Sequence, residues 1–298
     1  MLHQLLLSLG LLITGIALPA VATDISPLDA KIELGHRLFY DADLSLDGSM
    51  SCATCHEQRH AFSDGNPTHP GVTDEDGIRN VPSLANVGKF HTLTWINQHV
   101  ITLEDQFFIP LSGHNPVEMG MTNMAELSRR LSRNLCYRPL FSKAFPEKHI
   151  PIDARSVAEA VSAFERELTS YKSPWDLGLS GATRSQINGK EIFLGKGQCS
   201  SCHQPPLFTD QKFHALSISY SEPIRTPSLR NVEVTAPYLH DGSASTLKDA
   251  ILAHPKDQLL SQVELTDLTA FLKLLTDQDF LSNTKLGLPS EKCPLSTL

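Results

Sequence analysis

Two copies of the pattern Cys-x-x-Cys-His stand far apart in the sequence, and these residue types could hold an iron porphyrin. In each copy, two thiols can add across the vinyl groups of a haem, and the histidine that follows can bind the iron. A zinc or thiol-redox site would need a second Cys pair nearby or a thioredoxin-like βαβ pattern, and neither is present. The sequence therefore predicts two c-type haems, attached through Cys52, Cys55 and His56 and through Cys199, Cys202 and His203.

An internal repeat is expected to position the two motifs. Residues 34–40 precede the first motif and residues 188–194 precede the second, and the two segments are alike. An amphipathic helix should close each copy, because apolar side chains recur at i, i+3 and i+4 spacing. These side chains are Val157, Ala160, Val161, Phe164 and Leu168 in the first copy and Leu265, Leu268, Phe271, Leu272 and Leu275 in the second.

We therefore predict a mainly α fold, with two c-type cytochrome domains in tandem and long loops. The N-terminal domain should cover residues 23–169 and the C-terminal domain residues 186–298, each with one covalent haem. The stretch 170–185 contains Pro174, Gly178 and Gly181, which is typical of a linker.

Composition limits the location and the partners. The net charge of −8 and the absence of a basic run argue against binding to nucleic acid. A short apolar run from Leu5 to Leu18 precedes Ala20-Val21-Ala22, so residues 1–22 are predicted to be a signal peptide and the protein to be periplasmic. No later stretch is apolar enough for a transmembrane span.

Two cysteines, Cys136 and Cys293, lie outside the two haem motifs. They form either a disulfide or two unrelated buried thiols.

Two haems alone indicate either simple electron transfer or an enzyme, and the sixth iron ligands decide between them. An iron with protein ligands on both faces passes electrons, whereas an iron with an open face can bind peroxide. The motifs themselves do not distinguish the two.

Further segments resemble the bacterial di-haem cytochrome c peroxidase and MauG superfamily along nearly all of the mature chain. Within it, the segments 93–95 and 116–120 look most like the MauG-like branch associated with methanobactin and copper-repressible proteins, whose members oxidise a tryptophan of a partner protein. The segments that carry the resemblance are 79–86, 93–95, 103–106, Pro110, 115–120, 226–232 and 236–243.

The resemblance implies roles for particular residues near the first haem. The haem on His56 resembles the peroxide-reactive one, and Gln106 and Glu118 match the pair in its distal pocket. Glu118 would be the acid/base for cleavage of the O–O bond, since a carboxylate can move a proton between the two oxygens. Pro110 matches a residue that packs over the open iron face. Trp95 resembles a tryptophan that relays electrons between the two haems.

The resemblance also implies an inter-haem calcium ion, which Asn80, Thr235 and Pro237 match as ligands. One side-chain amide oxygen and two backbone carbonyls suit this hard cation.

Two positions depart from the family pattern. The sixth ligand of the second haem falls on His254, where peroxidases have Met and MauG has Tyr, and imidazole should lower the potential of this haem relative to a thioether. Resting peroxidases carry a distal His on the first haem. Here His69 is the nearest candidate, and its register is off by about three residues, so we predict an open iron on His56.

The sequence therefore predicts an oxidoreductase that uses hydrogen peroxide to oxidise an external substrate, a partner protein in the MauG-like reading. One alternative is a cytochrome c peroxidase that reduces peroxide to water with a small cytochrome. The other is a non-catalytic electron-transfer cytochrome.

Overall fold

The computed structural model describes residues 25–215, 222–254 and 260–290 of the 298-residue chain. The predicted signal peptide and Cys293 lie outside the described residues, whereas Cys136 is disulfide-bonded. The fold is mainly helical, as predicted. The first part of the chain holds α1 (Pro27–Phe39), α2 (Cys52–Cys55), α3 (Leu103–Gln106), α4 (Phe108–Ser112), α5 (Met124–Leu131), α6 (Tyr137–Ala144) and α7 (Ala154–Glu165). The second part holds α8 (Arg184–Leu194), β1 (Phe213–Ala215), β2 (Pro223–Arg225), α9 (Leu247–Ala253), α10 (Gln262–Leu272) and α11 (Gln278–Ser282).

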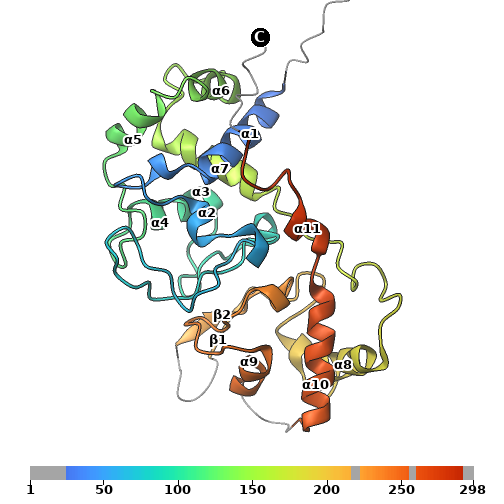
Figure 1. Ribbon diagram of the computed structural model, residues 1–298. Helices are drawn as coiled ribbons and strands as arrows, with labels where there is room; N and C mark the ends of the chain where they lie inside the picture. Colours follow the sequence, from blue (N-terminus) through green and yellow to red (C-terminus); the bar gives the residue numbers. More distant parts are fainter. Residues whose placement is uncertain (1–24, 216–221, 255–259, 291–298) are drawn as a thin grey trace, which may run out of the picture.

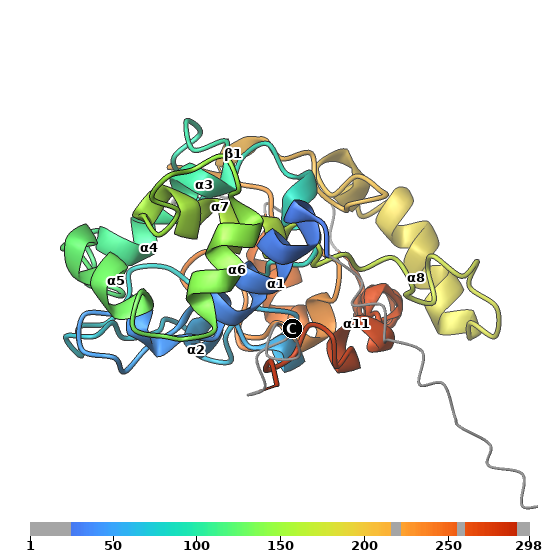
Figure 2. The same ribbon diagram turned by 90° about the horizontal axis from the view of Figure 1, so that it is seen from above.

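The helices form two groups. Figure 1 shows α1 and α5–α7 in one half of the molecule, α8–α10 with the two strands in the other, and α11 between them. From above, the two groups overlap, and α8 lies to one side of α1, α6 and α7 (Figure 2). The strands form an antiparallel pair in which Phe213 is opposite Arg225. None of the helices in the described ranges has the length and apolar character needed to cross a bilayer.

The first core forms where α1 crosses α7. Ser26 caps α1 at its N-terminus, where its side chain accepts a hydrogen bond from the backbone N–H of Asp29. A Cβ atom on Gly35 would lie 1.8 Å from the carbonyl oxygen of Ala160, so only glycine lets the two helix backbones approach this closely. The apolar face of α7 that was predicted from its periodicity is buried in this core.

The second core repeats this arrangement with α8 and α10. A Cβ atom on Gly189 would lie 1.9 Å from the carbonyl oxygen of Asp267, which makes Gly189 the counterpart of Gly35. Both helices begin with a capping box, formed by Thr183 and Gln186 in α8 and by Ser261 and Glu264 in α10. The helix-crossing glycines therefore lie in the two segments that the sequence marks as repeated.

The C-terminal segment packs against the first core. Phe280 of α11 and Leu286 are buried in the first core. The hydroxyl of Tyr40 donates a hydrogen bond to the carbonyl oxygen of Leu286 at 2.8 Å, and the amide of Gln58 donates to that of Phe280 at 3.1 Å. The second part of the chain thus completes the first core, while the domain boundaries given above stay a prediction.

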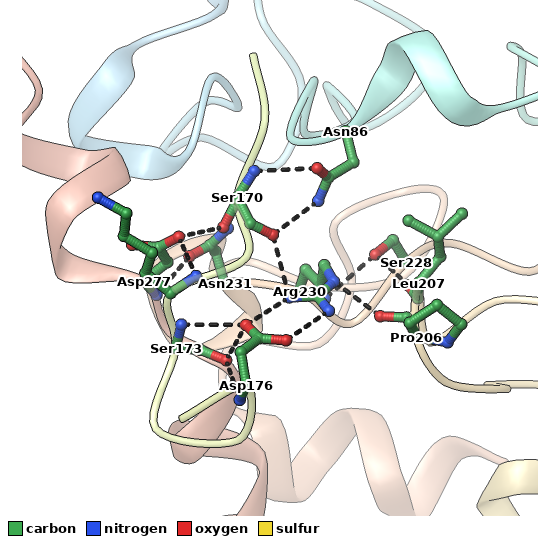
Figure 3. Close-up of polar contacts among 11 residues, drawn as sticks. Asn86, Ser170, Ser173, Asp176, Pro206, Leu207, Ser228, Arg230, Asn231 and Asp277 are labelled. Carbon is green, nitrogen blue, oxygen red and sulfur yellow. Dashed lines mark hydrogen bonds and ion pairs between the residues drawn. The ribbon is translucent and has the colours of Figure 1, made fainter. Parts of the chain in front are cut away.

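The predicted linker begins in a buried polar network that joins both halves (Figure 3). Asn86 and Ser170 exchange two hydrogen bonds of 2.9 and 3.1 Å. Arg230, which is 1% exposed, donates to the carbonyl oxygen of Ser170 and to both carboxylate oxygens of Asp176. Asp277 accepts from Ser170 and from the backbone N–H of Lys172. Hydrogen bonds and an ion pair at the start of the linker therefore hold the two halves together.

We expect Asp176→Asn to lower the free energy of unfolding by about 3 kcal/mol, because it leaves the Arg230 guanidinium buried without its counter-charge. Burial alone would raise the pKa of Asp176, but the hydrogen bonds from Arg230 and Ser173 lower it overall, so the carboxylate is charged at neutral pH. Urea unfolding of the holoprotein measures the loss. Lys172→Gln is the matched control, because it breaks an exposed ion pair with Asp279 and should cost less than ~1 kcal/mol. Equal losses of unfolding free energy in the two variants would contradict the role of Asp176 as the counter-charge of Arg230.

Candidate haem and peroxide sites

A cavity of about 500 Å³ in the second half brings the predicted ligands of the second haem together. Cys199, Cys202, His203 and His254 all line it, and most of the remaining lining residues are apolar. This volume is within the range of cofactor pockets in proteins. Two thiols and two imidazoles around one largely apolar cavity fit a covalently attached haem.

His203 is held so that one ring nitrogen is available to a metal. Its Nδ1 lies 3.1 Å from the backbone carbonyl oxygens of both Phe208 and Pro227, to which it donates. This contact places the proton on Nδ1 and leaves the lone pair on Nε2. Burial, followed by the nearby His254, lowers the pKa of His203 to about 4, so the ring is neutral, as a ligand must be.

His254 and His203 line the same cavity at a separation that would suit two ligands of one metal ion. The ring centroids are 6.3 Å apart. Two metal–imidazole bonds of about 2 Å, plus ~1 Å from each nitrogen to its ring centre, give ~6 Å. The Nδ1 of His254 donates to the carbonyl oxygen of Ala250 at 2.8 Å, which again leaves Nε2 for a metal. The position inferred by counting from Thr235 therefore lies close to His203, and its role as a haem ligand stays a prediction.

The first motif is built in the same way. Cys52 and Cys55 begin and end the single turn of α2, and His56 follows as its C-cap. The Nδ1 of His56 donates to the carbonyl oxygen of Phe62 at 2.8 Å, and burial lowers the pKa of the ring. Phe62 corresponds to Phe208 in the second half, so both motif histidines are oriented by the same backbone contact.

The predicted distal residues of the first site come from two neighbouring segments. Gln106 ends α3, and Pro110 lies one turn further on in α4. The backbone N–H of Met119 donates to the carbonyl oxygen of Pro110 at 2.9 Å, which holds Glu118 beside α4. A Cβ atom on Gly71 would lie 1.8 Å from the carbonyl oxygen of Val117, so a second loop also approaches this segment closely.

The side chain of Glu118 interacts with the first motif. Burial raises the pKa of its carboxyl, and the charge of His69 lowers it in part. The charge of the same carboxylate contributes to raising the pKa of the Cys55 thiol, and the charge of His69 contributes to lowering the pKa of His56. His69 thus lies within electrostatic range of both the motif histidine and the predicted acid/base, which its register in the sequence did not indicate. Whether the iron on His56 is open at rest stays a prediction.

Trp95 lies where the two halves meet. It is 9% exposed and lines the 500 Å³ cavity. Its indole N–H donates to the carbonyl oxygen of Asn80 at 2.7 Å, and its own carbonyl oxygen accepts from the backbone N–H of Arg225 at 2.9 Å. Asn80 and Arg225 occupy equivalent places in the two repeats, since each stands two residues before the proline of a Pro-Ser-Leu segment. Each half therefore holds Trp95 by one hydrogen bond.

The three residues predicted to bind calcium line one small cavity. Asn80, Thr235 and Pro237 surround a space of about 60 Å³ that Trp95 also borders. The Nδ2 of Asn80 donates to the backbone carbonyl oxygens of Asn66 and Pro67, at 3.2 and 3.1 Å, so the amide oxygen is the atom available to a cation. A hard cation with water ligands fits this set of oxygens.

Comparison with known proteins identifies the family. Residues 29–184 match the family model described as di-haem cytochrome c peroxidase. The chain belongs to this family. It is 30% identical over 280 residues to the methylamine utilization protein MauG of Methylophilus methylotrophus, covering 82% of each chain. It is 28% identical over 305 residues to the cytochrome c551 peroxidase of Nitrosomonas europaea, covering 91% of this chain and 89% of that protein.

A solved structure agrees with this assignment, and a second shares the fold. The crystal structure of a MauG-like protein associated with microbial copper homeostasis is similar with a TM-score of 0.82 and 32% identity, covering 88% of this chain and 93% of that one. The di-haem peroxidase BthA of Burkholderia thailandensis has a TM-score of 0.73 at 22% identity, which shows a shared fold. As a member of this family, the di-haem peroxidase carries two c-type haems and works with hydrogen peroxide and redox partners.

Proposed function

We propose that this di-haem peroxidase uses hydrogen peroxide to oxidise a tryptophan of a partner protein, as a periplasmic enzyme of two tandem cytochrome domains. The observation that carries the proposal is the position of His254 beside His203, with 6.3 Å between the centroids of the two imidazole rings. The haems supply the site where peroxide binds and the electrons that reduce it, and a second imidazole on one of them favours its more oxidised form compared with a thioether. The similarity to the MauG-like protein associated with copper homeostasis supports the same reading.

Glu118 moves the proton that cleavage of peroxide requires. As a carboxylate, it would accept a proton from one oxygen of peroxide and return it to the other, which would leave as water, with the two electrons supplied by the haems. Burial raises its pKa, which makes the carboxylate a better proton acceptor. Gln106 offers a hydrogen-bond donor and an acceptor but cannot carry a proton, so its role is to orient peroxide.

Trp95 connects the two sites. It borders the cavity predicted to hold the second haem. Its indole N–H donates a hydrogen bond to the backbone carbonyl oxygen of Asn80, which belongs to the first half. We propose that electrons pass through its ring, so that a partner bound at the second half is oxidised without reaching the peroxide site.

The experiment is to mix the ferric protein with hydrogen peroxide and a candidate partner, and to map oxidation by mass spectrometry of tryptic peptides. If a secreted copper-binding protein is encoded next to this chain, it is the first partner to test. Oxygen added at one tryptophan of the partner, absent with peroxide alone, is the expected result. Rapid oxidation of a reduced small cytochrome with no change in the partner protein would contradict the proposal.

That second outcome describes the alternative function, a cytochrome c peroxidase. The position of His69, within electrostatic range of His56 and Glu118, favours it, because resting peroxidases of this family carry a distal histidine on the first haem. A third possibility, a non-catalytic electron carrier, would be supported if peroxide left the absorption spectrum of the ferric protein unchanged.

We further propose that a calcium ion occupies the 60 Å³ cavity and stiffens the junction around Trp95. Removing it with a chelator should lower the melting temperature of the holoprotein and slow electron exchange between the haems, and added Ca²⁺ should restore both. Differential scanning calorimetry with and without chelator measures the first effect. Asn80→Ala should make the protein insensitive to the chelator. A melting temperature that neither treatment changes would contradict a calcium site here.

A further inference from the structure

Arg225 is a buried cation to which the proposed mechanism gives no role. It ends β2, its side chain is 4% exposed, and it lines both the 500 Å³ and the 60 Å³ cavities. The Nε–H of its guanidinium donates to the carbonyl oxygen of Thr94 at 3.0 Å, which fixes the direction of the side chain. Its Nη1 is buried and has no hydrogen-bond partner among the described residues.

The charge of Arg225 is also unbalanced. Burial is the one cause that lowers its pKa, to about 10, and no carboxylate in the described part of the chain raises that pKa. Arg79, at the same junction of the two halves, differs because its Nη2 lies 3.0 Å from a carboxylate oxygen of Glu222. A guanidinium taken out of water without a counter-ion is strongly unfavourable, so an anion is expected to complete the site.

The chemistry of the cavity indicates which anion this is. A calcium ion on Asn80 would add further positive charge beside Arg225. An anion between them would offset the electrostatic repulsion of the two cations. The haem between His203 and His254 carries two propionate carboxylates, and a guanidinium matches a carboxylate with two parallel hydrogen bonds. This pairing depends on the proposed position of that haem.

We propose that Arg225 binds a propionate carboxylate of the haem attached at Cys199 and Cys202, and that its charge sets the reduction potential of this haem. The guanidinium carbon also lies 6.0 Å from the ring centre of Trp95. A cation at this distance disfavours loss of an electron from the indole, and pairing with a carboxylate weakens that effect. Arg225 is thus a positioning residue that tunes both the second haem and Trp95.

The test is a spectroelectrochemical titration of both haems in the holoprotein, without peroxide. In Arg225→Gln, the equilibrium of the second haem should shift at least tenfold towards the ferric form, which is 59 mV for a one-electron couple. Arg225→Lys keeps the charge and should restore most of the wild-type potential. Arg184→Gln is the matched control, because Arg184 is exposed on α8, and both potentials should stay unchanged.

Three results would overturn the proposal. In the first, Arg225→Gln leaves the potential of the second haem unchanged. In the second, Arg225→Lys shifts that potential as far as Arg225→Gln, so that charge is not the cause. In the third, the haem on His56 shifts instead. Because no step of the titration involves peroxide or a partner, failure here is distinct from failure of the proposed reaction.

Discussion

Glu118→Gln should slow the reaction of the ferric protein with hydrogen peroxide by about 100-fold or more, while both haems and the fold are retained. The amide has nearly the shape of the carboxyl group but cannot accept and return a proton. A 100-fold loss is about 2.7 kcal/mol in activation free energy. Stopped-flow absorption at several peroxide concentrations gives the second-order rate constant.

Two comparisons make this result specific. Glu75→Gln is the matched control, because Glu75 is exposed on the loop that packs against the Glu118 segment, and its rate should equal that of the wild type. The wild-type rate should also rise with pH through the pKa of Glu118, which burial raises above the usual range of a carboxyl group, because the acceptor is the carboxylate. Glu118→Gln should lack this rise. A variant that reacts at the wild-type rate would remove Glu118 from the mechanism.

His254→Ala should change the ferric spectrum of the second haem and leave that of the first haem unaltered. Loss of the imidazole opposite His203 lets water take the position or leaves it open, and the haem then moves from low spin towards high spin. His254→Met should stay low-spin and raise the potential of this haem. We expect a shift of at least tenfold towards the ferrous form, or 59 mV.

His214→Ala is the control for His254. His214 lines the same cavity, but its Nε2 contacts a carboxylate oxygen of Asp210 at 2.8 Å, so its replacement should not alter the spectrum. If the second haem has the same ferric spectrum in wild type and His254→Ala, His254 is not a ligand, and the account of partner oxidation loses its main support.

Local patterns predicted the helices and the motifs well, because each depends on neighbouring residues. The periodicity of residues 157–168 marks the buried face of α7, and the repeat marks Gly35 and Gly189, although their role in close helix crossing is visible only in the fold. Both predicted closing helices ran slightly past the observed ends. α7 ends at Glu165, before Leu168, and α10 ends at Leu272, with a 3₁₀ turn that continues to Leu275.

Contacts between distant segments could not be predicted in this way. The packing of Phe280 into the first core depends on the path of the chain after α10, and no local pattern records that path. His69 appeared out of register because a loop was aligned by counting, whereas its position depends on how that loop folds back on the Glu118 segment. Arg225 was missed because its burial without an acid is a property of the assembled halves.

Electron paramagnetic resonance of the fully ferric protein tests the central claim most directly. The claim is that one haem has an open face for peroxide while the other is held by two histidines. The account predicts one high-spin signal from the haem on His56 and one low-spin signal from the haem between His203 and His254. Two low-spin signals and no high-spin signal would contradict the open peroxide site and indicate His69 as a sixth ligand.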